Sequence, residues 1–152
     1  MLALVTGASS GIGLQYATQL ARDYHCDLLL VSNQEEALQQ VAADLAEKYQ
    51  VKTAYHYADL SRQDAADELF EFCQKSGMEV DILVNDAGVF FFNPLMETSM
   101  ARIELMLNLH VVTVAKLCRL FGAEMAKRRH GYILNMSSMS AWMAMPGIQT
   151  YN

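Results

Sequence analysis

The sequence is short of charged residues and of proline. Charged residues make up 18% of its 152 residues and there are only two prolines, whereas hydrophobic residues make up 53%. Disordered segments and collagen-like chains need the opposite balance, so both classes are excluded. The length matches one domain, and a domain of this size buries enough surface to fold without disulfides or a structural metal. We therefore expect a single domain over residues 1–152.

Cysteine is also scarce. The three cysteines, Cys26, Cys73 and Cys118, are odd in number, far apart in the sequence and form no C-x-x-C pair. This spacing argues against a disulfide framework and against a zinc site, so no metal is expected. A reducing cytoplasm is the simplest compartment for such a chain. Residues 1–5 lack the basic residues that open a secretory signal peptide, which agrees with that expectation.

An excess of positive charge is missing as well. The formal net charge is -6, so the chain has no electrostatic footprint for nucleic acid. The one basic cluster, residues 127–130, falls where a long helix should end, and cations there complement the helix dipole. The most apolar stretch is residues 105–126. We expect a buried helix here and no membrane span, because the stretch contains the polar side chains of Asn108, His110, Lys116, Arg119 and Glu124.

What the sequence does contain is an alternation of strand-length apolar runs with longer segments of helical period. Strands are expected at residues 2–6, 27–31, 51–57, 81–84 and 132–136. Helices are expected at residues 13–23, 35–49 and 64–75, followed by a long helix that Ser99 caps and that ends near Lys127. Strands so rich in Val, Ile and Leu are buried on both faces, and the alternation makes the sheet parallel. The prediction is an α/β fold with a Rossmann-like, doubly wound parallel sheet, whose ligands bind beyond the carboxyl ends of the strands.

The loop after the first predicted strand is rich in glycine. Residues 6–13 read TGASSGIG, with three glycines spaced G-x-x-x-G-x-G between a strand and a helix. Glycine lets the backbone approach a ligand closely, and the start of the following helix offers free N–H groups and a positive dipole. A plain tight turn is the alternative, but it needs one glycine rather than three. The loop therefore predicts a phosphate or dinucleotide site.

Together with five later features in the same order, this loop makes the whole chain similar to the short-chain dehydrogenase/reductase family, whose glycine motif is TGxxxGxG. The later features are Asp59 in ADL, Asn85 at the start of NDAG, Asn108 in the long helix, Ser138 after the fifth strand, and Tyr151. The resemblance implies binding of a nicotinamide dinucleotide. It also implies an oxidoreductase that interconverts a secondary alcohol and a carbonyl by hydride transfer.

The resemblance assigns the dinucleotide to the loops at the carboxyl edge of the sheet. The glycine turn would hold the pyrophosphate and Asp59 the adenine amino group. A cap for the helix expected near Arg62 is the alternative role of the Asp59 carboxylate, and the cofactor role is favoured. NDAG departs from the family's NNAG at Asp86. An acid near a bound dinucleotide is unexpected, although Asp, the nearest isostere of Asn, could keep one acceptor contact while losing the donors of the amide. The predicted cofactor-binding residues are Gly7, Ser9, Ser10, Gly11, Ile12, Gly13, Ser32, Asn33, Asp59, Leu60, Asn85, Ala87 and Gly88.

The end of the second predicted strand bears on the choice of cofactor. An acid at this point accepts from the ribose hydroxyls of NAD, whereas a basic residue favours the 2′-phosphate of NADP. Ser32, Asn33 and Gln34 stand here, so no acid repels a phosphate. Neither Arg nor Lys is present at Ser9, Ser10 or Asn33 to hold one, and Ser or Asn can bind either group. The pattern favours NADP(H) over NAD(H).

A carbonyl that is reduced by hydride needs a proton donor and hydrogen-bond donors around its oxygen. Tyr151 follows Ser138 by thirteen residues, which is the family's spacing, so the resemblance makes Tyr151 the proton donor and Ser138 the residue that orients the carbonyl. Ser137 is an alternative, because neighbours on a strand face opposite ways.

Asn108 either marks a kinked turn or, as the resemblance implies, distorts the helix and holds a water that leads to a catalytic lysine. His110 is expected to be a hydrogen-bonded core histidine.

The family's catalytic lysine stands four residues after the tyrosine, and this chain ends at Asn152. We therefore expect the chain to be the N-terminal part of a larger enzyme, with five strands of a larger sheet, and to be inactive by itself. A non-catalytic dinucleotide-binding or redox-sensing module is the alternative function. The resemblance also implies a homodimer or homotetramer that packs through the long helix.

Several apolar residues near the predicted site bear on the substrate. They would form a deformable apolar rim, although they would serve equally well in a core or a subunit interface. An apolar ketone or an acyl-thioester β-ketone is therefore expected rather than a sugar. These residues are Phe90, Phe91, Phe92, Met136, Met139, Trp142, Met143 and Met145.

Overall fold

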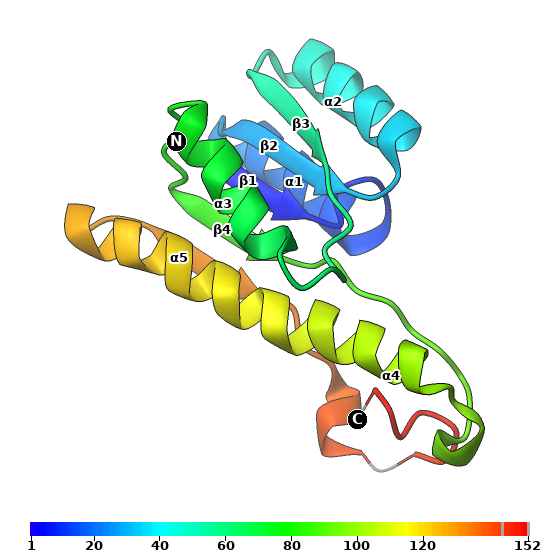
Figure 1. Ribbon diagram of the computed structural model, residues 1–152. Helices are drawn as coiled ribbons and strands as arrows, with labels where there is room; N and C mark the ends of the chain where they lie inside the picture. The colour runs from blue at the N-terminus through cyan, green and yellow to red at the C-terminus, as the bar shows by residue number, and fades with distance from the viewer. Residues whose placement is uncertain (144, 152) are drawn as a thin grey trace.

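The computed structural model describes residues 1–143 and 145–151, and it contains one parallel sheet with helices on both faces (Figure 1). The strands are β1 (Leu2–Thr6), β2 (Asp27–Ser32), β3 (Thr53–Tyr57), β4 (Ile82–Asn85) and β5 (Tyr132–Asn135). They lie in the order β3-β2-β1-β4-β5, and every pairing is parallel. The predicted doubly wound α/β fold is confirmed. Its strand order reverses between β1 and β4, the point at which such sheets bind ligands.

The helices follow the strands as predicted, with one exception. Helices α1 (Gly11–Tyr24), α2 (Glu35–Tyr49) and α3 (Ala65–Lys75) begin and end close to the predicted positions. The long helix, by contrast, consists of α4 (Met100–Leu107), a π-helical turn η2 (Asn108–Val112) and α5 (Thr113–Arg128). Its predicted cap is present, since the Ser99 hydroxyl accepts a hydrogen bond from the Arg102 N–H. Two short 3-10 helices, η1 (Leu95–Glu97) and η3 (Met139–Trp142), lie in the loops after β4 and β5.

The core forms two layers, one on each face of the sheet. Along β1, Ala3 and Val5 pack in the layer covered by α1 and α2, whereas Leu4 packs in the layer covered by α3 and α5. In β2, Leu28 and Leu29 divide between the two layers in the same way. Successive side chains of a strand point to opposite faces, so a strand that is covered on both sides is apolar throughout. This explains why residues 2–5 of β1 and 28–31 of β2 are unbroken apolar runs in the sequence.

Helices α4 and α5 are buried along one face only. By length and composition, the stretch Met100–Arg128 is long and apolar enough to cross a membrane, and 28% of its most apolar window is buried. Leu117 and Phe121 pack against α3 and the sheet, while Leu107 and Val111 are exposed. The expectation of a buried helix is therefore only partly correct. An apolar, exposed face remains beside the face that packs on the sheet.

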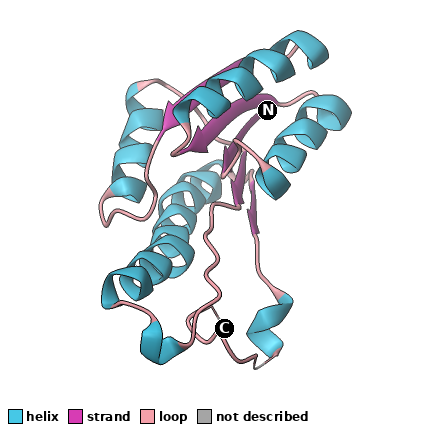
Figure 2. Cartoon of the chain, turned by 90° about the vertical axis from the view of Figure 1, so that its right-hand side faces the viewer, coloured by secondary structure: helices cyan, strands magenta, loops and turns pink. Residues whose placement is uncertain are grey.

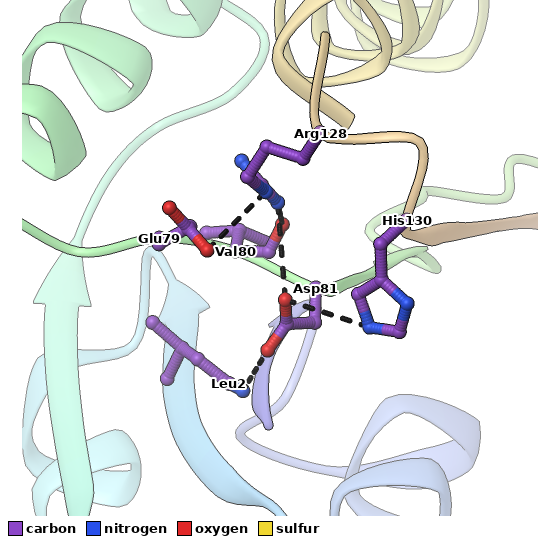
Figure 3. A network of polar contacts seen from close by, with 6 residues as sticks. All are labelled: Leu2, Glu79, Val80, Asp81, Arg128 and His130. Carbon is purple, nitrogen blue, oxygen red and sulfur yellow. Dashed lines mark hydrogen bonds and ion pairs between the residues drawn. The ribbon is translucent and has the colours of Figure 1, made fainter. Parts of the chain in front are cut away.

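A network of polar contacts ties β1, β4 and α5 together (Figure 3). It lies at the amino ends of the strands, whereas the glycine loop follows the carboxyl end of β1. Asp81, just before β4, accepts a hydrogen bond of 2.9 Å from the Leu2 N–H. Arg128, in the last turn of α5, donates from Nη2 to the Val80 carbonyl at 2.8 Å and lies 3.8 Å from Asp81 Oδ1. Its Nε lies 3.3 Å from Glu79 Oε1. Part of the basic cluster thus holds the sheet together, besides lying at the carboxyl end of a helix dipole.

We predict that Arg128→Met destabilises the fold by about 1 to 3 kcal/mol, because a half-buried charged donor and its partners lose each other. Urea unfolding followed by circular dichroism measures the change. Arg62→Met is the matched control, since Arg62 pairs with Glu68 on the exposed surface, where ion pairs add little. An Arg128 variant as stable as the Arg62 variant would contradict this role.

Candidate functional site

The glycine turn between β1 and α1 needs each of its three glycines for a specific reason. Gly7 and Gly11 have positive φ angles of 68° and 58°, which side chains disfavour. Gly13 has no such angle, but a Cβ on it would lie 2.4 Å from the Gly7 carbonyl oxygen. Helix α1 begins here without an acidic residue in its first turn, and its N-cap, Ser10, makes no side-chain hydrogen bond. The turn therefore presents the free N–H groups of Gly11 and Ile12, and no acidic residue of the helix itself offsets its positive dipole.

The loop after β4 is fastened to this turn through Thr6. The Thr6 hydroxyl accepts hydrogen bonds of 3.0 Å from the N–H groups of both Asp86 and Ala87. A Cβ on Gly7 would lie 3.0 Å from the Ala87 backbone, so the two loops are in close contact. Asn85 extends the same loop into the sheet, because its Nδ2 donates to Asn135 Oδ1 of β5 at 2.8 Å. The NDAG segment thus joins β1, β4 and β5 at one edge.

Asp86, the residue that departs from the family motif, lies against the first turn of α1. Its carboxylate accepts a hydrogen bond from the Gly13 N–H, and its Oδ2 would lie 2.9 Å from a Cβ on Gly13. Burial raises the pKa of the Asp86 carboxyl, and the hydrogen bond from Gly13 opposes that shift. An acidic group therefore occupies the start of the helix at which a phosphate would be expected.

The loops after β2 and β3 carry small polar groups. The hydroxyls of Ser9 and Ser32 are 2.8 Å apart, so the glycine turn is also hydrogen-bonded to the end of β2. Asp59 Oδ1 accepts from both the N–H and the hydroxyl of Ser61, at 3.0 and 2.7 Å. The carboxylate thus caps a turn, as the alternative interpretation proposed, although α3 begins later, at Ala65. Both Asp59 and Ser32 nevertheless face the same cleft.

This cleft has a volume of about 800 Å³ and is surrounded by the loops after all five strands. Two predicted site residues do not line it: Gly13, which packs beneath the turn, and Asn108, in the long helix. The predicted site residues that the structure brings together around it are Gly7, Ser9, Ser10, Gly11, Ile12, Ser32, Asn33, Asp59, Leu60, Asn85, Ala87, Gly88, Ser138 and Tyr151.

Asn108 begins the π-helical turn that interrupts the long helix. Its carbonyl accepts a hydrogen bond from the N–H of Thr113, five residues later, instead of the residue four later. The Thr113 hydroxyl then donates to the Leu60 carbonyl at 2.8 Å and so fixes α5 against the loop after β3. Such turns occur frequently at functional sites. Both interpretations of Asn108 expected a local distortion of the helix, and the structure has one.

The loop after β5 brings both candidate serines to the cleft. The Ser138 hydroxyl accepts from the Ser140 N–H at 3.1 Å and donates to the Ser140 hydroxyl at 3.0 Å, so it caps η3. Both Ser137 and Ser138 therefore line the cleft. Of the two, Ser138 is the one whose hydroxyl is hydrogen-bonded to Ser140. A serine whose hydroxyl is already oriented is the better prepared of the two to bind a carbonyl oxygen.

The ring of Tyr151 is held between two other rings. Phe90 lies edge-to-face with it at 5.2 Å between centroids, and His110 at 5.6 Å. His110 Nε2 in turn lies 3.1 Å from the Val89 N–H nitrogen and 3.0 Å from the Val89 carbonyl oxygen. The histidine is hydrogen-bonded, as expected, but it lines the cleft and joins the β4 loop to Tyr151, which the sequence analysis missed. The glycine at position 88 is the one local feature of the sequence that could have indicated this contact, because a Cβ there would lie 2.7 Å from His110 Cε1.

The charges around the cleft are acidic. Asp59 and Asp86 line it, whereas no Lys or Arg is among the described residues that do. Within residues 1–143 and 145–151 there is also no group of three or more His, Cys, Asp or Glu side chains that could hold a metal ion. Attraction for an anionic ligand must therefore come from backbone N–H groups and from the α1 dipole.

Comparison with known proteins gives consistent matches over the whole chain. The sequence model described as short chain dehydrogenase matches residues 1–152. A very-long-chain 3-oxoacyl-CoA reductase from Anas platyrhynchos is 34% identical over 155 residues, which cover 99% of this chain and 49% of that protein. The chain thus spans about half the length of the curated relatives that it matches.

Solved structures are similar over the same extent. A bulky-bulky ketone specific alcohol dehydrogenase from Comamonas testosteroni superposes with a TM-score of 0.91 at 28% identity, covering 99% of this chain and 59% of that one. A short-chain dehydrogenase from Sphingobium yanoikuyae, in complex with NADPH, also has a TM-score of 0.91, at 27% identity and with coverages of 99% and 58%.

Proposed function

Because the chain belongs to the short-chain dehydrogenase family, we propose that it is the dinucleotide-binding part of an oxidoreductase that interconverts a secondary alcohol and a carbonyl compound. The observation that carries this proposal is the cleft itself, in which the glycine turn and the pair Ser138 and Tyr151 line one cavity. Cofactor residues and catalytic residues that are separate in the sequence are thereby combined as hydride transfer requires.

The cleft has the features that a nicotinamide dinucleotide requires. Gly7 and Gly13 keep the turn closely packed, and the N–H groups at the start of α1, including that of Ile12, are available to a pyrophosphate. The hydroxyls of Ser9 and Ser32 offer hydrogen bonds to a ribose at the other end. When bound, such a cofactor supplies or accepts the hydride.

In this mechanism, Tyr151 moves the proton. As hydride reaches the carbonyl carbon, the Tyr151 hydroxyl donates its proton to the carbonyl oxygen and recovers one from solvent; in the oxidation direction these steps reverse. The Ser138 hydroxyl, whose proton is directed to Ser140 Oγ in the structure, turns to donate a hydrogen bond to the same oxygen and stabilises the charge that develops on it. Phe90 and His110 fix the plane of the Tyr151 ring, so that its hydroxyl keeps one orientation toward the cleft.

We also propose that NADP(H) is preferred over NAD(H). Ser32, Asn33 and Gln34 include no carboxylate that would repel a 2′-phosphate, and the related Sphingobium yanoikuyae dehydrogenase was solved with NADPH. Calorimetric titration of the protein with each cofactor is expected to show tighter binding of NADP(H) than of NAD(H). Binding of NAD(H) that is tenfold tighter, about 1.4 kcal/mol, would contradict this preference.

The proposed substrate is an apolar ketone or an acyl-thioester β-ketone. The loops after β4 and β5 extend beyond the sheet and meet near the start of α4 (Figure 2), where a Cβ on Gly147 would lie 2.9 Å from the Phe92 ring. Met139 and Trp142 are 79% and 90% exposed on this side. The names of the duck reductase and of the Comamonas dehydrogenase, an acyl-CoA reductase and a bulky-ketone enzyme, agree with a rim of this kind.

The test of the proposed function measures oxidation of NADPH and NADH by the change in absorbance. The candidate substrates are a panel of apolar ketones, β-ketoacyl thioesters and sugars. The longest natural form of the protein should reduce an apolar member of the panel. The 152-residue chain should bind cofactor but turn over nothing, because its relatives are about twice as long and no described cation lines the cleft beside Tyr151. Cofactor binding without turnover in the longest form would instead support the binding-module alternative.

We further propose a homodimer or homotetramer in the cytoplasm. The exposed apolar residues of the long helix that do not line the cleft, Met100 of α4 and Val112 of η2, would be covered by the same helix of a second copy. In the longest natural form of the protein, further strands of the same chain would extend the sheet past β5. This strand lies at the edge of the sheet, and its residues Tyr132, Ile133 and Leu134 are exposed.

A further inference from the structure

We propose that Asp86 makes dinucleotide binding depend on protonation: its carboxylate weakens binding of the anionic cofactor, and binding is accompanied by uptake of a proton on the Asp86 carboxyl. The inference rests on the proposed cofactor site. It concerns how the affinity of that site is set.

The position of Asp86 carries the argument. The carboxylate accepts a hydrogen bond from the Gly13 N–H in the first turn of α1, and it packs directly on the Gly13 backbone. It lines the same cleft as Gly11 and Ile12, whose N–H groups are the ones available to a pyrophosphate. An anion and a carboxylate would therefore share one helix dipole, and each would oppose the other.

Among the residues that the structure describes, no Lys or Arg lines the cleft to compensate for this charge. The segment Gly7–Gly13 carries no titratable side chain. The other titratable groups that line the cleft are Asp59, His110 and Tyr151. Protonation of Asp86 is the change nearest to α1 that would remove a negative charge.

The free protein already favours this protonation in part. Burial raises the pKa of the Asp86 carboxyl, against the opposing hydrogen bond from Gly13, and an anion bound nearby would raise it further. By linkage, affinity should be highest at low pH and should fall as the pH rises through the titration of Asp86. Because the pKa of Asp86 is raised in the folded protein, the ionised carboxylate does not stabilise the fold at neutral pH. The Asp86→Asn variant should therefore unfold at the same temperature as wild type or at a higher one.

The experiment compares cofactor binding by the wild-type protein and by Asp86→Asn, at about pH 5.5 and about pH 8. At the higher pH the Asn variant should bind NADP⁺ about tenfold more tightly than wild type, and at the lower pH the difference should shrink. NAD⁺ is the second probe, because it lacks the 2′-phosphate that itself titrates in this range. Asp44→Asn, on the exposed side of α2, removes the same charge outside the cleft and should bind as wild type does.

Proton uptake gives a measurement that does not depend on the variant. Calorimetric titration of wild type with NAD⁺, in two buffers with different heats of ionisation, should show that binding takes up protons. The Asp86→Asn variant should take up fewer. Equal affinities for wild type and Asp86→Asn at the higher pH, or no uptake by wild type at either pH, would overturn the inference while leaving the cofactor site intact. Absence of binding by every variant would instead overturn the proposed function.

Discussion

Tyr151→Phe should lower the rate of carbonyl reduction by roughly 10² to 10⁴ in the longest natural form of the protein, because it removes the positioned proton donor. Phenylalanine keeps the ring, so the edge-to-face contacts with Phe90 and His110 at 5.2 and 5.6 Å should remain. The loss should therefore appear in kcat rather than in KM. Steady-state kinetics with NADPH and the best ketone of the panel measure both.

Serine variants extend this test. Ser138→Ala should reduce kcat more than Ser137→Ala, because the Ser138 hydroxyl is already oriented by Ser140. Tyr132→Phe is the control for loss of a phenol, since Tyr132 is exposed on β5 outside the cleft and should leave the rate unchanged. Full activity in Tyr151→Phe would contradict the proposed proton transfer.

Gly13→Val should weaken dinucleotide binding by at least about tenfold, or about 1.4 kcal/mol. A Cβ on Gly13 would lie 2.4 Å from the Gly7 carbonyl oxygen and 2.9 Å from Asp86 Oδ2, so the turn and the β4 loop must both move. Fluorescence titration with NADPH measures the affinity, and circular dichroism reports whether the fold is retained.

Gly122→Ala is the matched control for this substitution. Its Cβ would meet only the side chain of Ile133, at 3.5 Å, and alanine favours the helix, so neither binding nor folding should suffer. If Gly13→Val fails to fold, Gly13→Ala provides the smaller perturbation. Unchanged affinity in a folded Gly13 variant would show that the turn does not hold the cofactor.

The fold could be predicted from the sequence because its determinants are local. Strand β1 contains an apolar run, residues 2–5, and a glycine follows the strand. Each helix shows its period in its own residues or its cap just before them, as Ser99 does for α4. The same holds for the glycine turn, since the positive φ angles of Gly7 and Gly11 are properties of single positions. Periodicity and turn residues are therefore sufficient for these features.

Features that depend on distant contacts could not be predicted in this way. The π-helical turn at Asn108 is coupled to Thr113, whose hydroxyl binds the Leu60 carbonyl 53 residues away. The contact between His110 and Tyr151 likewise joins a helix to a loop after β5. An apolar helix face gives no sign, in the sequence, of whether the fold covers it, so the exposure of Leu107 and Val111 was missed.

The most direct test of the central claim, a dinucleotide site at the carboxyl edge of the sheet, is to follow the amide resonances of the chain by NMR during titration with NADP⁺. The account predicts shifts in residues 7–13, 32–34 and 85–89, with no change at the opposite edge around Leu2, Asp81 and Arg128. Shifts confined to that opposite edge, or none at saturating NADP⁺, would contradict it.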